Sequence, residues 1–186
     1  MGGDLPAKPD NAKAPTFAVW AMKDPDSGNL DRIQIVKGWY QNGYGWEKIY
    51  DVAWSDGRKP DDSGKLPPVG TTVDVAHATY TNSIGDNELM TVWTDPDFDP
   101  SLHAVYYVRV IEIPTPRWST YDARVMGIDP PAGAPATIQE RAWSSPIWYT
   151  PAAGTFTPRD YYPGLEKYLQ PEGGTTLGVI HLRDKS

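Results

Sequence analysis

Cysteine is absent from the 186-residue sequence, and basic residues are scarce. Without cysteine the fold cannot depend on disulfide bonds, and no thiol can serve as nucleophile or metal ligand. Lysine and arginine number 17 against 24 acidic residues, which gives a formal net charge of −7. A negative chain disfavours non-specific contact with phosphate backbones, so we expect no nucleic-acid partner.

Long hydrophobic runs are also missing. No apolar stretch approaches the ~20 residues that a transmembrane helix needs, so we expect no membrane partner. Residues 1–15 are rich in Pro, Ala, Lys and Asp and lack the apolar segment of a signal peptide. We expect them to form an extended lead-in, and the sequence leaves the localisation open.

Turn formers and aromatic residues dominate what remains. The chain has 19 prolines, 17 glycines, 11 tyrosines and eight tryptophans but only three phenylalanines. This composition is typical of short strands joined by turns. Period-two patterns bounded by turn residues predict strands over 16–22, 31–39, 46–55, 71–81, 87–94, 103–113 and 138–149.

About seven strands without alternating helices predict an all-β fold, an antiparallel β-sandwich of the immunoglobulin-like kind. We place this sandwich in residues 16–150, with long Pro-rich loops, and we leave residues 151–186 as an irregular tail of unknown structure. The excursion over 114–137 is proline-rich and has room for one helical turn. A closed barrel is the alternative.

Several residues are assigned to the core by their position in these patterns. Residues 16–22 are apolar on both faces, which predicts a central strand with Trp20 inside. Trp54 shares a strand face with other apolar residues and is also expected in the core. His77 continues the face of Val73 and Val75, so we expect it at a strand end on the rim of the core.

The segment "ERAWSSPIWYT" (140–150) combines strand-forming bulk with a proline. Pro146 cannot donate a ladder hydrogen bond, which restricts it to an edge strand or a bulge. The segment could be a ligand surface or the last strand of the sandwich. We favour a closing edge strand.

Candidate metal ligands occur in "DPDFDP" (95–100), where Asp95, Asp97 and Asp99 could bind a surface calcium ion. The alternative is a loop stiffened by its prolines. The three histidines lie far apart in the sequence and show no zinc-site spacing. No cofactor is predicted.

Candidate ligand or interface residues are Arg109, Trp118 and Trp148. Arg109 lies mid-strand opposite the apolar face and could bind an anionic ligand, although pairing across the strand is the more common role. Trp118 and Trp148 have no predicted place in the core. Exposed aromatic rings of this kind can stack on carbohydrate or form an interface.

Long ordered blocks of the sequence resemble one known family. The blocks include "APTFAVWAMKDPDSGNLDRIQIVKGW" (14–39), "LPPVGTTVDVAHATYTNSIGDNEL" (66–89) and "YYVRVIEIPTPRWSTYDA" (106–123). They are similar to the C-terminal part of the bacterial domain-of-unknown-function 3604 family, over roughly residues 1–151. Members of that family look like relatives of the polymerase-and-histidinol-phosphatase hydrolases, whose metal ligands lie in a barrel upstream of the matched region.

Three functions are therefore open. The resemblance favours a non-catalytic accessory sandwich that packs on, or shapes, a catalytic barrel; its partner would be that barrel or a second copy of the chain. Away from its barrel, such a domain should expose an apolar patch of several hundred Å². The alternatives are an independent glycan- or calcium-binding module, and a small metal-dependent hydrolase whose ligands converge only in the fold.

Overall fold

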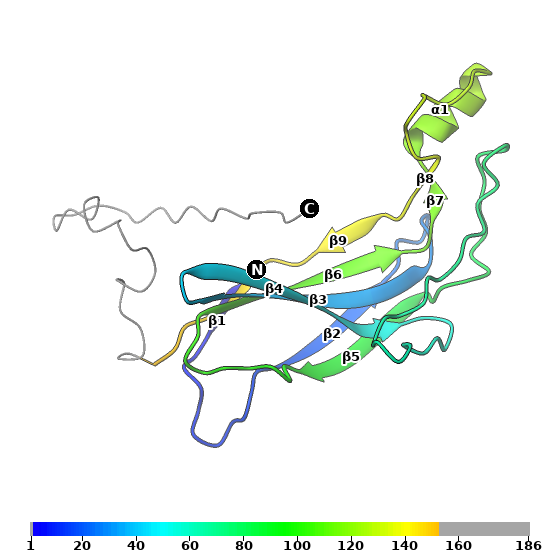
Figure 1. Cartoon of the computed structure of the whole chain (residues 1–186). Coiled ribbons are helices and arrows are strands. Elements are labelled where there is room, and N and C mark those ends of the chain that lie inside the picture. The colour runs from blue at the N-terminus through cyan, green and yellow to red at the C-terminus, as the bar shows by residue number, and fades with distance from the viewer. Residues whose placement is uncertain (1, 153–186) are drawn as a thin grey trace, which may run out of the picture.

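The computed structural model describes residues 2–152 and shows a chain built mainly from β-strands (Figure 1). Five longer strands lie close to their predicted positions. The elements are β1 (Gly3–Leu5), β2 (Thr16–Met22), β3 (Leu30–Gln41), β4 (Tyr44–Trp54), β5 (Glu88–Thr94), β6 (Ala104–Glu112), β7 (Thr115–Pro116), α1 (Trp118–Met126), β8 (Thr137–Ile138), β9 (Arg141–Trp143) and β10 (Ile147–Tyr149).

The larger sheet has the strand order β1-β10-β6-β3-β4, and β9 also pairs with β6. Its centre is antiparallel, with β3 hydrogen-bonded to β4 on one side and to β6 on the other. The β3–β4 turn contains Asn42 and Gly43, which have φ angles of 55° and 84°. A two-residue hairpin turn with positive φ at both positions matches the twist of the strands that it joins. Asn and Gly adopt positive φ readily, and an Asn-Gly pair therefore predicts a tight hairpin.

The smaller sheet consists of β2 and β5, paired antiparallel along their whole lengths. One side of this pair packs on the larger sheet, where Phe17, Val19 and Trp93 contact a core of Ile35, Ala104, Tyr106 and Tyr149. Two sheets that bury their facing sides against each other form a sandwich. The predicted antiparallel, sandwich-like fold is confirmed, and its immunoglobulin-like character stays a prediction.

The prediction that residues 16–22 form a central strand with two buried faces is wrong. Along β2, residues alternate between exposed and partly buried, and Trp20 is 65% exposed. The larger sheet covers only one side of β2. The other side of β2 faces outward, because no further layer formed by residues 2–152 covers it. Trp54, also expected in the core, is only partly buried; it is opposite Arg32 in the β3–β4 pairing and is not among the residues of the two core clusters.

The predicted strand over 71–81 is also wrong. The chain turns back on itself there, since the amide of Asp74 donates to the carbonyl of Thr79 at 2.8 Å and the reverse bond is 3.1 Å. The Asp74 carboxylate accepts the backbone N–H of His77 at 3.1 Å and contacts its ring Nδ1 at 2.7 Å. This side chain stabilises a turn in place of a ladder. His77 is therefore exposed and not on the core rim.

The predicted closing strand is split into β9 and β10, with Pro146 between them. Pro146 thus occupies a break in the ladder, where no donor is needed. The edge assignment is wrong for β10, because β1 pairs with it in parallel and lies at the edge. Part of the predicted lead-in is therefore a strand of the larger sheet.

The proline-rich excursion contains α1, which is longer than the single turn expected. Its last turn ends at Gly127, whose φ of 66° is left-handed and whose N–H bonds to the carbonyl of Ala123. With β7 and β8, α1 projects from one end of the sandwich (Figure 1). Within residues 2–152, no helix is long and apolar enough to cross a membrane. The predicted tail lies outside the described residues from 153 onward.

Candidate functional site

The aspartates at 95, 97 and 99 lie at the end of β5, and the structure gives each carboxylate its own protein partner. Asp95 is buried and pairs with the ammonium of Lys37 at 2.6 Å. Asp97 binds Lys48 and accepts the hydroxyl hydrogen of Tyr50 at 2.7 Å. The Asp99 carboxylate accepts from Ser101, which stabilises a turn.

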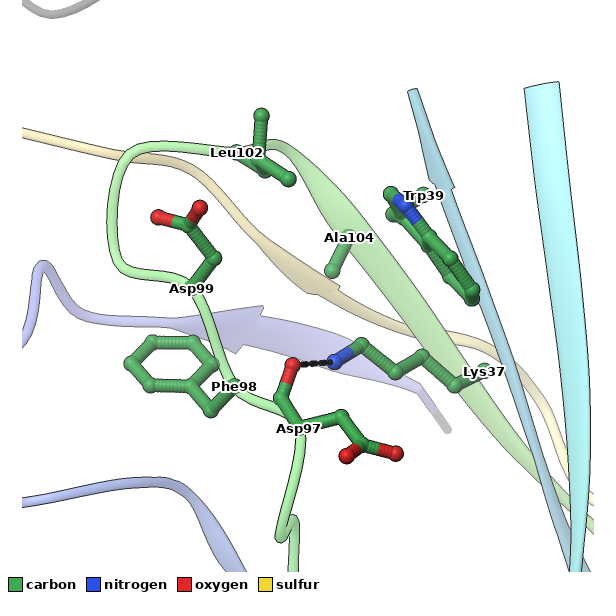
Figure 2. A pocket seen from close by; sticks show the side chains of 7 residues that line it. All are labelled: Lys37, Trp39, Asp97, Phe98, Asp99, Leu102 and Ala104. Atoms are coloured by element: carbon green, nitrogen blue, oxygen red, sulfur yellow. Dashed lines mark hydrogen bonds between the residues drawn. The ribbon is translucent and has the colours of Figure 1, made fainter. Parts of the chain in front are cut away.

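Lys37 connects the Asp95 side chain with the backbone of Asp97. Its Nζ contacts the Asp95 carboxylate. It also donates to the carbonyl oxygen of Asp97 at 2.8 Å (Figure 2). Tyr106 donates its hydroxyl hydrogen to the same Asp95 carboxylate at 2.7 Å. The Lys48 and Tyr50 hydrogen bonds hold the pKa of Asp97 below its ordinary value, so this carboxylate is ionised and already satisfied.

The space beside this cluster is small. Its volume is about 30 Å³, comparable with one water molecule, and Figure 2 shows Trp39, Phe98 and Leu102 around it. No group of three or more His, Asp or Glu side chains in residues 2–152 is arranged to hold a metal ion. The three candidate calcium carboxylates thus bond to three different partners, Lys37, Lys48 and Ser101.

Arg109 lies on the outer face of the larger sheet, in a row of polar side chains that crosses three strands. Its Nε donates to Gln34 Oε1 at 2.8 Å, and Gln34 Nε2 donates to Asp51 Oδ1 at 2.7 Å. Arg109 thus pairs across the strand, which is the more common of the two roles considered. Its contact with an anionic ligand stays a prediction.

Trp148 lies on the same outer face as Arg109, whereas Trp118 does not. Trp148 is opposite Val105 in the β10–β6 pairing, and Val105 shares a face of β6 with Arg109. Trp143, which the sequence analysis did not select, is opposite Arg109 and 58% exposed. Trp118 is exposed at the start of α1, at one end of the sandwich.

A second surface feature is the outer side of the β2–β5 pair, which we call the β2–β5 apolar face. It is formed by Trp20, Met22, Met90 and Val92, which are 65%, 66%, 75% and 71% exposed. Trp20 is directly opposite Met90 in the strand register, so these side chains are neighbours. The sequence alone does not reveal this face, because the alternation of β2 between exposed and buried positions is hidden when both sets of positions are apolar.

Polar groups border the β2–β5 apolar face. The Trp20 indole N–H donates to Glu88 Oε2 at 3.2 Å. At the other end of the strand pair, the hydroxyl groups of Thr16 and Thr94 form a hydrogen bond of 2.8 Å. An apolar centre with a polar rim is the anatomy of a protein–protein contact.

Comparison with known families supports the resemblance noted from the sequence blocks. Residues 1–151 match the model of a family described as protein of unknown function, DUF3604. The chain belongs to the DUF3604 family. No curated protein and no solved structure matches it. The relationship of DUF3604 proteins to metal-dependent hydrolases stays a prediction.

Proposed function

We propose that this DUF3604 chain is a non-catalytic accessory β-sandwich that packs on a catalytic barrel through the β2–β5 apolar face. The observation that carries the proposal is the exposure of Trp20, Met22, Met90 and Val92 on one continuous side of a two-stranded sheet. Contiguous apolar surface of this kind is uncommon on a monomeric protein and marks contact surfaces.

The interior of the sandwich supports an accessory role. The buried carboxylate of Asp95 is paired with Lys37 and accepts a hydrogen bond from Tyr106. It also accepts from the Asp97 amide, so its partners are all groups of the fold itself. The barrel as partner follows from the family resemblance, and the apolar face explains how contact with it would be stabilised.

The test compares two exposed apolar sites on the same chain. In the double variant Trp20→Thr/Met90→Thr, the β2–β5 apolar face is made polar by a residue that favours strands. The matched control, Val125→Thr/Ile128→Thr, changes side chains that are 86% and 59% exposed near α1. Sedimentation velocity is measured for each protein alone and mixed with the separately produced barrel of a longer DUF3604 protein.

We expect the wild-type chain and the control to bind the barrel equally, and the Trp20→Thr/Met90→Thr variant to bind at least about tenfold more weakly. Equal binding by all three proteins would place the contact elsewhere. Absence of binding in the wild-type mixture would reject the accessory role, provided that the barrel is folded by circular dichroism.

A further inference from the structure

The outer face of the larger sheet carries two exposed tryptophans on one line. Trp143 on β9 is opposite Arg109, and Trp148 on β10 is opposite Val105, so both are attached along β6. They are 58% and 46% exposed. Their partners are four positions apart along β6, which places the two tryptophan backbones about 14 Å apart along the strand.

An extra residue between β9 and β10 is what places both tryptophans on one face. From Trp143 to Ile147 the chain advances four residues, while the opposite strand advances three, from Arg109 to Tyr106. Residues five apart in a regular strand point to opposite faces. The additional residue reverses this relation, as a β-bulge does, and Trp148 joins Trp143 on the outer side.

The bulge is held by specific hydrogen bonds. The Ser144 amide donates to the carbonyl of Val108 at 3.0 Å, and Ser144 Oγ accepts the Val108 N–H at 3.0 Å. Ser144 therefore replaces the missing ladder contacts at the break. Because the break is stabilised, the position of the two indole rings is built into the sheet.

Polar side chains lie beside the two tryptophans on this face. Arg109 is oriented by Gln34, itself nine-tenths buried, and Gln34 is held by Asp51. Within residues 2–152, the guanidinium of Arg109 makes no other hydrogen bond and no ion pair, so its terminal nitrogens remain available as donors. Tyr107 lies on the same side of β6, between Arg109 and Val105.

We propose that this surface, defined by Trp143, Trp148, Tyr107 and Arg109, binds an extended oligosaccharide. Two indole rings separated along a strand suit stacking on two sugar units of one extended chain, and an oriented guanidinium beside Trp143 suits hydroxyl or carboxylate oxygens. A folded protein partner is less suited, because such contacts centre on contiguous apolar surface, which this chain exposes on its other layer. The site is independent of the proposed barrel contact, since the outer faces of the two layers point in opposite directions (Figure 1).

The ligand panel consists of cellohexaose, maltohexaose and hexagalacturonate, with glucose and galacturonic acid as single-unit probes. Binding to the full 186-residue chain is followed by nuclear magnetic resonance of the indole N–H groups and by calorimetry. We expect one hexasaccharide to shift the Trp143 and Trp148 signals and to bind at least about tenfold more tightly than its monosaccharide. Preference for hexagalacturonate would assign the Arg109 contact to a carboxylate, and preference for a neutral chain to hydroxyl groups.

Trp143→Thr and Trp148→Thr should each weaken this binding by about tenfold, because one stacking surface is lost. Trp46→Thr is the matched control, since Trp46 is 52% exposed but belongs to the opposite side of the same sheet. Urea unfolding verifies that each variant is folded. Binding that survives both variants, or no binding to any oligosaccharide in the panel, would overturn the proposal whatever the outcome of the barrel experiment.

Discussion

At the residue scale, the interior is organised around an ion pair. Lys37 and Asp95 are 5% and 0% exposed in their side chains and 2.6 Å apart. Their remaining hydrogen-bonding capacity is used by Tyr106, by the carbonyl of Asp97 and by the Asp97 amide. Replacing such a pair by apolar residues of similar volume is often neutral, whereas removing one partner leaves an uncompensated buried charge.

Lys37→Met should therefore destabilise the chain by about 3–5 kcal/mol, because Asp95 loses its counterion. The double variant Lys37→Met/Asp95→Asn should recover at least about 2 kcal/mol, since the uncompensated buried charge is gone. Urea unfolding monitored by tryptophan fluorescence measures both. A double variant less stable than the single one would show that the carboxylate, and not the pair, holds the loop.

At the element scale, the long connection between β4 and β5 is held by contacts near its two ends. Arg58 Nη2 donates to the Asp31 carboxylate at 2.6 Å and to the Asp31 carbonyl at 2.7 Å, which ties the start of the connection to β3. Gly85, near the end, has φ +75°, and an added Cβ would lie 2.6 Å from Ile113 Cγ2 and 2.8 Å from Asn29 Cβ. The connection is therefore positioned by close packing as well as by hydrogen bonds.

Gly85 and Gly127 provide a matched pair for testing this packing. Both have positive φ, but an added Cβ at Gly127 would meet no atom within 4 Å. Gly127→Ala should cost about 1 kcal/mol from backbone strain alone. Gly85→Ala should cost about 3 kcal/mol or more, because overpacking adds to the same strain. Thermal or urea unfolding measures the loss of stability in each variant. Equal losses in the two variants would mean that the β4–β5 connection moves away from Ile113 at no cost in free energy.

At the scale of the whole molecule, shifted pKa values predict stability limits on both sides of neutrality. Burial lowers the pKa of His103 below 6.5, and hydrogen bonds lower the pKa values of Asp97 and Asp99 below 3.8. Burial chiefly raises the pKa values of Tyr50 and Tyr106 above 10.0. The folded state therefore disfavours protonation of His103, Asp97 and Asp99 and disfavours ionisation of the two tyrosines, relative to the unfolded chain.

The free energy of unfolding should consequently decline as pH falls through 6.5 and again below 3.8, because the unfolded chain then binds more protons. It should also decline as pH rises above 10.0, because the unfolded tyrosines ionise while Tyr106 stays protonated. Urea unfolding across this range measures both limits. His103→Gln should flatten the first acidic step, and Tyr106→Phe the alkaline one; an unchanged profile in both variants would contradict these assignments.

Some features of this DUF3604 chain were determined by local sequence alone. The period-two patterns located β2 to β6, and Asn42-Gly43 located the tight β3–β4 turn. Strand alternation and turn conformation depend on neighbouring residues, so a single sequence contains them. The same patterns failed over 71–81, where one carboxylate, that of Asp74, forms a turn that competes with a ladder.

Tertiary structure decided which surfaces are buried and which side chains meet. Only the packing of the two sheets shows that β2 turns Trp20 outward, and that Lys37 pairs with Asp95 in the interior. Only the pairing with β6 shows that one extra residue brings Trp148 to the side of Trp143. These outcomes depend on contacts between residues far apart in the chain, and a register difference of one residue reverses the face of every side chain beyond it.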